Sequence, residues 1–159
     1  MTTRNTTLVA NALASPQVFN DAAELHGVLR TACGTAELLA GDSTDNDVVL
    51  LAPISSKASI STLLIGSDTL GGSCTFNVGV HNYDGTVGDE DAFATSVADA
   101  GAMTDVRYEA ATINTAGQKL WELAGLSEDP GGMLYVSITF DATGGTAGTL
   151  SWDISYTVN

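Results

Sequence analysis

This sequence has few basic residues. Of its 159 residues, 5 are Lys or Arg and 19 are Asp or Glu, which gives a formal net charge of -14 at pH 7. A protein with this charge repels a phosphate backbone or an anionic lipid surface rather than neutralising it. We therefore expect neither nucleic acid nor a membrane among its partners. Charge of one sign on this scale also favours solubility and opposes non-specific association.

Cysteine and long apolar runs are scarce as well. Cys33 and Cys74 are too few for a disulfide framework, and we expect two ordinary buried thiols of a protein made in a reducing compartment. No run approaches the roughly 18 apolar residues that a membrane-spanning helix needs. Met1–Thr7 is rich in hydroxyl groups and no long apolar segment follows it, so the sequence predicts neither a spanning segment nor a signal peptide.

The 44% of hydrophobic residues provide a core for one domain of this length. Three segments, 75–81, 134–141 and 150–158, alternate apolar and polar residues with period two, as a strand does with one face on a core. The last two flank Gly144-Gly145 and predict a C-terminal antiparallel hairpin.

Further short apolar runs predict more strands. Val48–Ile54 and Ile60–Ile65 are typical of strands buried on both faces, Gly27–Cys33 adds another strand, and Val106–Ala110 a weaker one. Gly, Asp and Ser clusters separate these runs, as in turns. The expected fold class is all-β: a single-domain antiparallel β-sandwich or jelly roll with one short helix.

The helix is expected over Ala116–Ala124, with Thr115 and Gln118 as a capping box and Gly125 as the stop. A helical turn is expected over Asp91–Ala98, inside a long loop from Tyr83 to Met103.

Residues 1–24 lack clear periodicity, and we interpret them as an N-terminal arm that precedes a β-sandwich domain over residues 25–159. The apolar residues of this arm must be covered by this subunit's own sheet or by a neighbour. The candidate contact residues for such a neighbour are Leu8, Val9, Leu13, Pro16, Val18 and Phe19.

One segment looks like a catalytic motif. Leu38–Asp45 resembles the nucleophile block of GDSL-type serine hydrolases, with Ser43 as the nucleophile. A serine needs a histidine base, and that family supplies it from an Asp-x-x-His block that this sequence lacks. We therefore expect an acidic turn between two strands here, and no enzymatic activity.

Metal sites have weak support in the sequence. The spacing of His26, Cys33, Cys74 and His81 does not match that of zinc ligands. Ca²⁺ accepts irregular cages of oxygen atoms, so calcium in an acidic loop stays open, although solvated loops are the default and no cofactor is expected. The two candidate loops contain Asp42, Asp45 and Asp47, and Asp89, Glu90 and Asp91.

The chain resembles a group of tailed-phage proteins, often from marine phages, that are understood as capsid decoration or cement proteins. The resemblance covers most of the length and lies in Ala14–Pro16, Glu24–Arg30, Lys119–Ser127, Asp129–Gly131 and the end segment at Gly148–Leu150.

This resemblance implies a structural virion protein that is assembled in the host cytoplasm and decorates and stabilises the outer surface of a phage capsid. Its implied partners are the major capsid protein and its own copies, as a homotrimer. The alternatives are another phage structural protein, such as a tail or fibre protein, and a carbohydrate-binding β-sandwich module. In such a module exposed aromatic rings would stack on sugars, whereas Trp121 and Trp152 are expected to serve packing.

Overall fold

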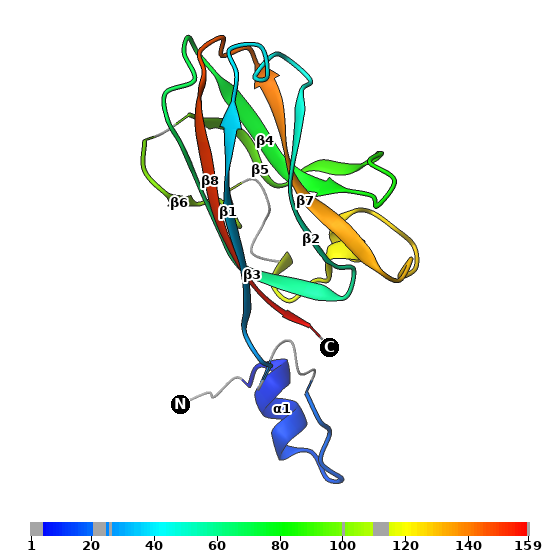
Figure 1. The fold of residues 1–159 in the computed structure, drawn as a ribbon. Coiled ribbons are helices and arrows are strands. Elements are labelled where there is room, and N and C mark those ends of the chain that lie inside the picture. The colour runs from blue at the N-terminus through cyan, green and yellow to red at the C-terminus, as the bar shows by residue number, and fades with distance from the viewer. Residues whose placement is uncertain (1–4, 21–24, 26, 100, 110–114, 159) are drawn as a thin grey trace.

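The structure, a computed structural model, describes residues 5–20, 25, 27–99, 101–109 and 115–158. Two antiparallel four-stranded sheets pack face to face (Figure 1). The first sheet has the strand order β1 (Arg30–Leu38), β8 (Gly148–Val158), β3 (Ala58–Ser67), β6 (Thr104–Asp105). The second has the order β2 (Val48–Ser55), β7 (Met133–Ala142), β4 (Thr75–His81), β5 (Val87–Ala98). The expected all-β sandwich is confirmed.

The order of the strands is that of a jelly roll. Strand β1 pairs with β8, β2 with β7, β3 with β6 and β4 with β5, so the chain folds as one long hairpin wrapped into two sheets. Only the β4–β5 connection stays within one sheet, and every other connection crosses to the opposite sheet.

The predicted C-terminal hairpin is wrong. Strands β7 and β8 lie in different sheets, where β7 pairs with β2 and β4, and β8 pairs with β1 and β3. The connection between them is held by long-range bonds: the Gly144 N–H donates to the Ser43 carbonyl at 2.8 Å, and the Thr146 N–H to the Leu70 carbonyl at 2.7 Å. Alternation fixes which face of a strand is apolar, but it does not fix the partner strand.

The apolar face of the predicted alternation is confirmed, whereas His81, Ser137, Thr139 and Thr157 on the predicted polar face are buried as well. Its apolar residues point between the sheets, where Phe76 and Phe140 meet edge to face with ring centroids 6.1 Å apart. The buried apolar residues of the three alternating segments are Phe76, Val78, Val80, Leu134, Val136, Ile138, Phe140, Leu150 and Ile154.

Several predicted boundaries need correction. Strand β1 begins at Arg30 rather than Gly27 and runs to Leu38, and β6 covers Thr104–Asp105 rather than Val106–Ala110, whose last residue lies outside the described ones. Strand β2 is an edge strand and is not buried on both faces.

The helical turn expected over Asp91–Ala98 is wrong, because this segment belongs to β5. Phe93 and Ala94 are both fully buried there, and irregular pairing with β4 brings adjacent side chains into the core. The i and i+4 spacing of apolar residues in this segment therefore belongs to a distorted strand and not to a helix.

Two short helices occur in the described residues. Helix α2 (Leu120–Leu123) is shorter than predicted: its N-cap is Lys119, whose N–H donates to the Glu122 side chain at 2.8 Å. It ends as predicted at Gly125, which has a φ of 71°, and the Gly125 N–H to Glu122 and Leu126 N–H to Trp121 hydrogen bonds form a Schellman motif. Helix α1 (Thr7–Leu13) lies in the arm and was not predicted. None of the described helices is long and apolar enough to cross a bilayer.

Candidate interaction surface

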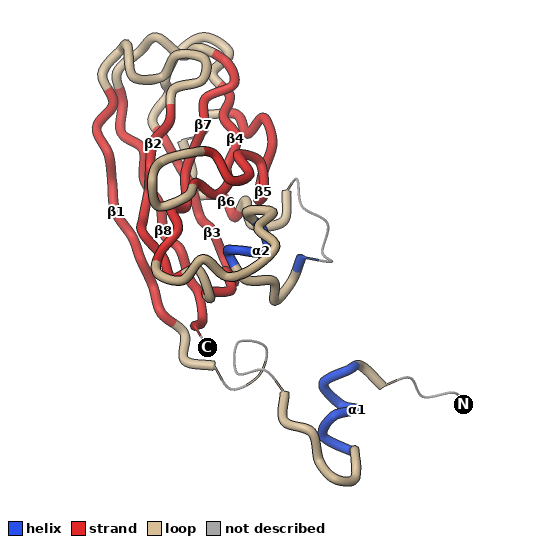
Figure 2. Tube along the Cα trace, turned by 90° about the vertical axis from the view of Figure 1, so that its right-hand side faces the viewer, coloured by secondary structure: helices blue, strands red, loops and turns tan. Residues whose placement is uncertain are grey.

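The described part of the arm, residues 5–20, lies beyond the end of the sandwich at which β1 begins (Figures 1 and 2). Its helix α1 begins after Thr6, whose side chain accepts from the Val9 N–H at 3.5 Å. After the helix the chain folds back, and Asn20 bonds the Asn11 side chain at 2.8 Å and the Leu8 carbonyl at 3.1 Å. The arm is therefore a small closed unit.

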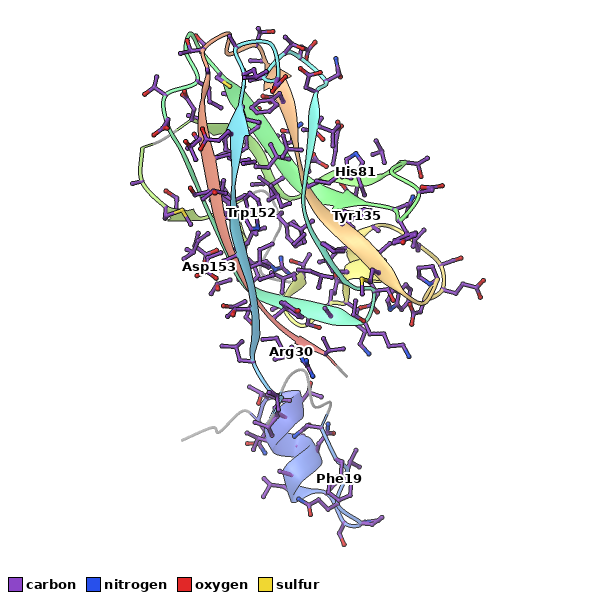
Figure 3. All side chains as sticks on the ribbon, in the orientation of Figure 1. Phe19, Arg30, His81, Tyr135, Trp152 and Asp153 are labelled. Carbon is purple, nitrogen blue, oxygen red and sulfur yellow. The ribbon has the colours of Figure 1, made fainter. Side chains whose placement is uncertain are left out.

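The predicted contact residues are mostly exposed on this unit. Phe19 is 89% exposed and points away from the sandwich (Figure 3), and Leu13 is 71% exposed. Val9, Pro16 and Val18 are exposed too, and Leu8 is half-buried. No Asp, Glu, Lys or Arg occurs in residues 5–20. The arm thus presents a neutral apolar surface on a strongly acidic protein.

A short helix of this kind needs packing for its stability. Isolated helices of fewer than about 12 residues are marginal in water, and α1 has 7 residues of which none is fully buried. A set of uncovered apolar side chains on such a helix is typical of a protein interface.

Strand β1 continues from the arm and forms an edge of its sheet. Its outward side chains, Thr31, Cys33, Thr35 and Glu37, are all exposed. Such an edge offers unpaired backbone groups to another chain. The exposure of Cys33 also corrects the expectation of two buried thiols, which holds only for Cys74.

Ser43 lies in the turn between β1 and β2, which confirms the expected turn between two strands. Its side chain is fully buried, and its Oγ accepts from the Gly145 N–H at 3.3 Å. These contacts hold the acidic turn against the connection between β7 and β8. Among the described residues, no histidine hydrogen-bonds Ser43.

A different serine lies next to a histidine. His81 Nδ1 and Ser137 Oγ are 2.7 Å apart, on neighbouring strands β4 and β7. Both side chains are buried, and burial lowers the pKa of His81 below its ordinary value while Glu90 opposes this shift. Because Ser137 is fully buried, a substrate has no access to it in this structure.

The carboxylates of the acidic loops mostly bond within their own turns. Asp42 accepts from the Leu39 N–H, and Asp47 accepts from the Thr44 side chain and backbone, which hold the pKa of Asp47 below its ordinary value. Asp89, Glu90 and Asp91, expected in a loop, lie instead in strand β5, where burial raises the pKa of Asp89. The described residues contain no group of three His, Cys, Asp or Glu that could hold a metal ion, and His26 lies outside them. The expectation of no cofactor, with calcium left open, stays an expectation.

The two tryptophans pack against the core. A groove of about 720 Å³ lies elsewhere on the sandwich and was not predicted from the sequence. Its walls are the turn between β4 and β5 and the segment before β7, which are more than 40 residues apart in the sequence. The lining residues are Asn82, Tyr83, Asp84, Leu126, Pro130, Gly131, Gly132, Met133 and Leu134.

A solved structure from a cyanophage is similar to this chain. It is a chain of the cyanophage Pam1 capsid asymmetric unit, with 13% identity, a TM-score of 0.49, and coverage of 84% of this chain and 86% of that chain. No family profile and no curated protein matches the chain.

Proposed function

We propose that this chain is a structural protein of a tailed-phage virion that decorates and stabilises the outer surface of the capsid. The observation that carries the proposal is the part of the arm over residues 5–20, which has no charged side chain and exposes Leu13 and Phe19, in a chain of net charge -14. The sequence resemblance to decoration proteins suggests that the surface contacted by such an arm is the outside of a capsid. The partners are then the major capsid protein and further copies of this chain, as a homotrimer.

The charge distribution supports an outward location. A net charge of -14 opposes contact with packaged DNA. Residues 5–20 of the arm carry no charged side chain, so they can approach another acidic protein without the repulsion between like charges that the acidic sandwich would meet. The arm therefore carries the attachment, while the acidic sandwich faces solvent.

The energetics require more than the arm alone. Ordering a residue costs about 1 to 2 kcal/mol of backbone entropy, and burying an apolar side chain returns about 1.5 to 3 kcal/mol. The bonds of Asn20 to Asn11 and Leu8 already order part of the arm before it docks, which lowers this cost. Contacts of the β1 edge and repeated attachment of linked copies would add the remaining affinity.

Deleting residues 1–20 tests the role of the arm. The sandwich should remain folded, with unchanged circular dichroism in the β region, while retention on phage heads in a sedimentation assay falls. Equal retention of the truncated and full-length proteins would show that the arm is not the attachment. A gel of purified virions gives the copy number, and absence of the chain from virions would overturn the whole proposal.

We also propose that the chain is not an enzyme. Ser43 and Ser137 are both fully buried, and each already has a structural hydrogen bond. Ester hydrolysis by the purified protein should stay at background, and a Ser43→Ala variant should be indistinguishable from it. A turnover that disappears in Ser43→Ala and approaches about 1 s⁻¹ would contradict this.

A further inference from the structure

The groove beside Tyr83 has the chemistry of a carbohydrate site. It exists because the β4–β7 ladder ends at the pair His81 and Tyr135, beyond which the two strands diverge. His81 and Tyr135 lie together on that side of the sandwich in Figure 3. The volume of about 720 Å³ is within the range of small-molecule sites.

One wall carries an exposed aromatic ring in a fixed orientation. The Tyr83 ring stacks on Tyr135 with an interplanar angle of 8° and 5.9 Å between centroids. Tyr83 is nevertheless 69% exposed. The face of an aromatic ring carries partial negative charge, and the C–H groups on one face of a pyranose ring carry partial positive charge. An exposed ring face therefore suits a sugar ring.

The same wall offers hydrogen-bond acceptors. Asp84 accepts from the Thr86 N–H at 3.0 Å and from the Thr86 hydroxyl at 2.6 Å, and both bonds use Oδ1. These bonds hold the pKa of Asp84 below its ordinary value, so the carboxylate is ionised at neutral pH. Oδ2 takes part in neither bond. The Asn82 amide nitrogen donates to Thr86 and Val87, and its Oδ1 takes part in neither of those bonds.

Both walls are held in place before any ligand arrives. In the turn, the Asn82 N–H donates to the Thr86 carbonyl at 2.8 Å, and the Gly85 N–H to the Asn82 carbonyl at 2.9 Å. On the opposite wall, Asp129 accepts from Ser56 at 2.6 Å and from the Gly131 N–H at 2.9 Å. A fixed site loses less entropy when it binds a ligand.

The remaining surface is apolar and open. A Cβ on Gly131 or Gly132 would meet no atom within 4 Å, so a ligand can approach the backbone there. Met133 is half exposed beside them, at 49%. Because Asp84 lines the groove and the chain carries a charge of -14, an anionic ligand is disfavoured.

We propose that this groove binds a neutral carbohydrate, with one pyranose ring stacked on Tyr83 and its hydroxyl groups bonded to Asp84 and Asn82. The site is independent of the proposed capsid attachment, which uses the arm. The most direct rival occupant is the apolar arm of a second copy.

The test is titration of the full-length ¹⁵N-labelled protein with neutral tetrasaccharides built from glucose, mannose, galactose or N-acetylglucosamine. At least one should shift the amide resonances of Gly131, Gly132 and Met133. Tyr83→Ala should weaken that binding by about tenfold or more, which is about 1.4 kcal/mol. Phe19→Ala, which removes an exposed aromatic ring from the arm, should leave it unchanged.

Three results would overturn the proposal. The first is the absence of shifts at the groove with every neutral sugar. The second is sugar binding that Tyr83→Ala does not weaken while the variant remains folded by circular dichroism. The third is a synthetic peptide of residues 5–20 that shifts the groove resonances when no sugar does, which would assign the groove to a second copy.

Discussion

The indole ring of Trp152 lies directly over Gly34 on the neighbouring strand. The two residues are cross-strand partners in the β1–β8 ladder, and a Cβ built on Gly34 would come within 2.7 Å of the indole Cζ2. The edge strand β1 thus keeps a glycine because the ring of Trp152 occupies the space that a side chain would need.

We predict that Gly34→Ala lowers the free energy of unfolding by about 1 kcal/mol or more, within the range for overpacking. The indole N–H resonance of Trp152 should shift, while that of Trp121 stays in place. Gly41→Ala is the matched control, since a Cβ there meets nothing within 4 Å. A Gly34→Ala protein as stable as this control would contradict the close packing.

Replacing Arg107 even by lysine should destabilise the protein. Arg107 is fully buried, with its guanidinium 5.0 Å from the Phe93 ring centroid and 4.6 Å from that of Tyr108. It donates to the Ile60 carbonyl and to the Thr115 carbonyl, both at 3.0 Å. A lysine ammonium cannot reproduce this planar fork.

Arg107→Lys should therefore destabilise the protein by about 1 to 3 kcal/mol, the cost of leaving a buried carbonyl without its donor. Urea unfolding followed by circular dichroism measures the change. Arg30→Lys, at an exposed position, serves as the control and should change nothing. If both variants unfold at the same urea concentration, the buried fork does not stabilise the fold.

His81 should make the stability depend on pH. Its pKa is lowered by burial, so the folded state holds its proton more weakly than the unfolded state, whose pKa is near 6.5. The unfolded state then binds more protons, and stability is lost as the pH falls below about 6.5 towards the folded pKa.

His81→Asn retains an amide that can bond Ser137 and removes this titration. Between about pH 7.5 and about pH 5.5, the wild type should lose more unfolding free energy than the variant does. Parallel losses in the two proteins would show that His81 is not the group responsible.

The apolar side chains of the arm should matter for attachment and not for folding. Leu13→Ser with Phe19→Ser should leave the melting temperature of the sandwich unchanged, because both side chains are exposed. Retention on phage heads should fall. Leu39→Ser, at an apolar position on the sandwich that is 70% exposed, is the control and should be retained like the wild type. Equal losses for the two proteins would mean that the arm has no special part in attachment.

Some of the candidate sites could be predicted from the sequence, and one could not. The acidic turn at Ser43 and the apolar arm could be predicted, because each consists of neighbouring residues with a local chemical character. The groove beside Tyr83 could not be predicted, because the Asn82–Asp84 turn and the Gly131–Met133 segment meet only where β4 and β7 diverge.

The sequence by itself determined the local features. Alternation gave the buried face of β4, β7 and β8, Gly125 gave the end of α2, and the excess of acidic residues gave the charge. Such features depend on neighbouring residues and on the period-two alternation, and both can be recognised from the order of residues without knowing the fold. Only the tertiary structure decided that β7 and β8 lie in opposite sheets. Strand pairing depends on long-range packing and on connections that cross between the sheets. One of these, the connection from β7 to β8, is held by the hydrogen bond from Gly144 to Ser43, and no local pattern encodes it.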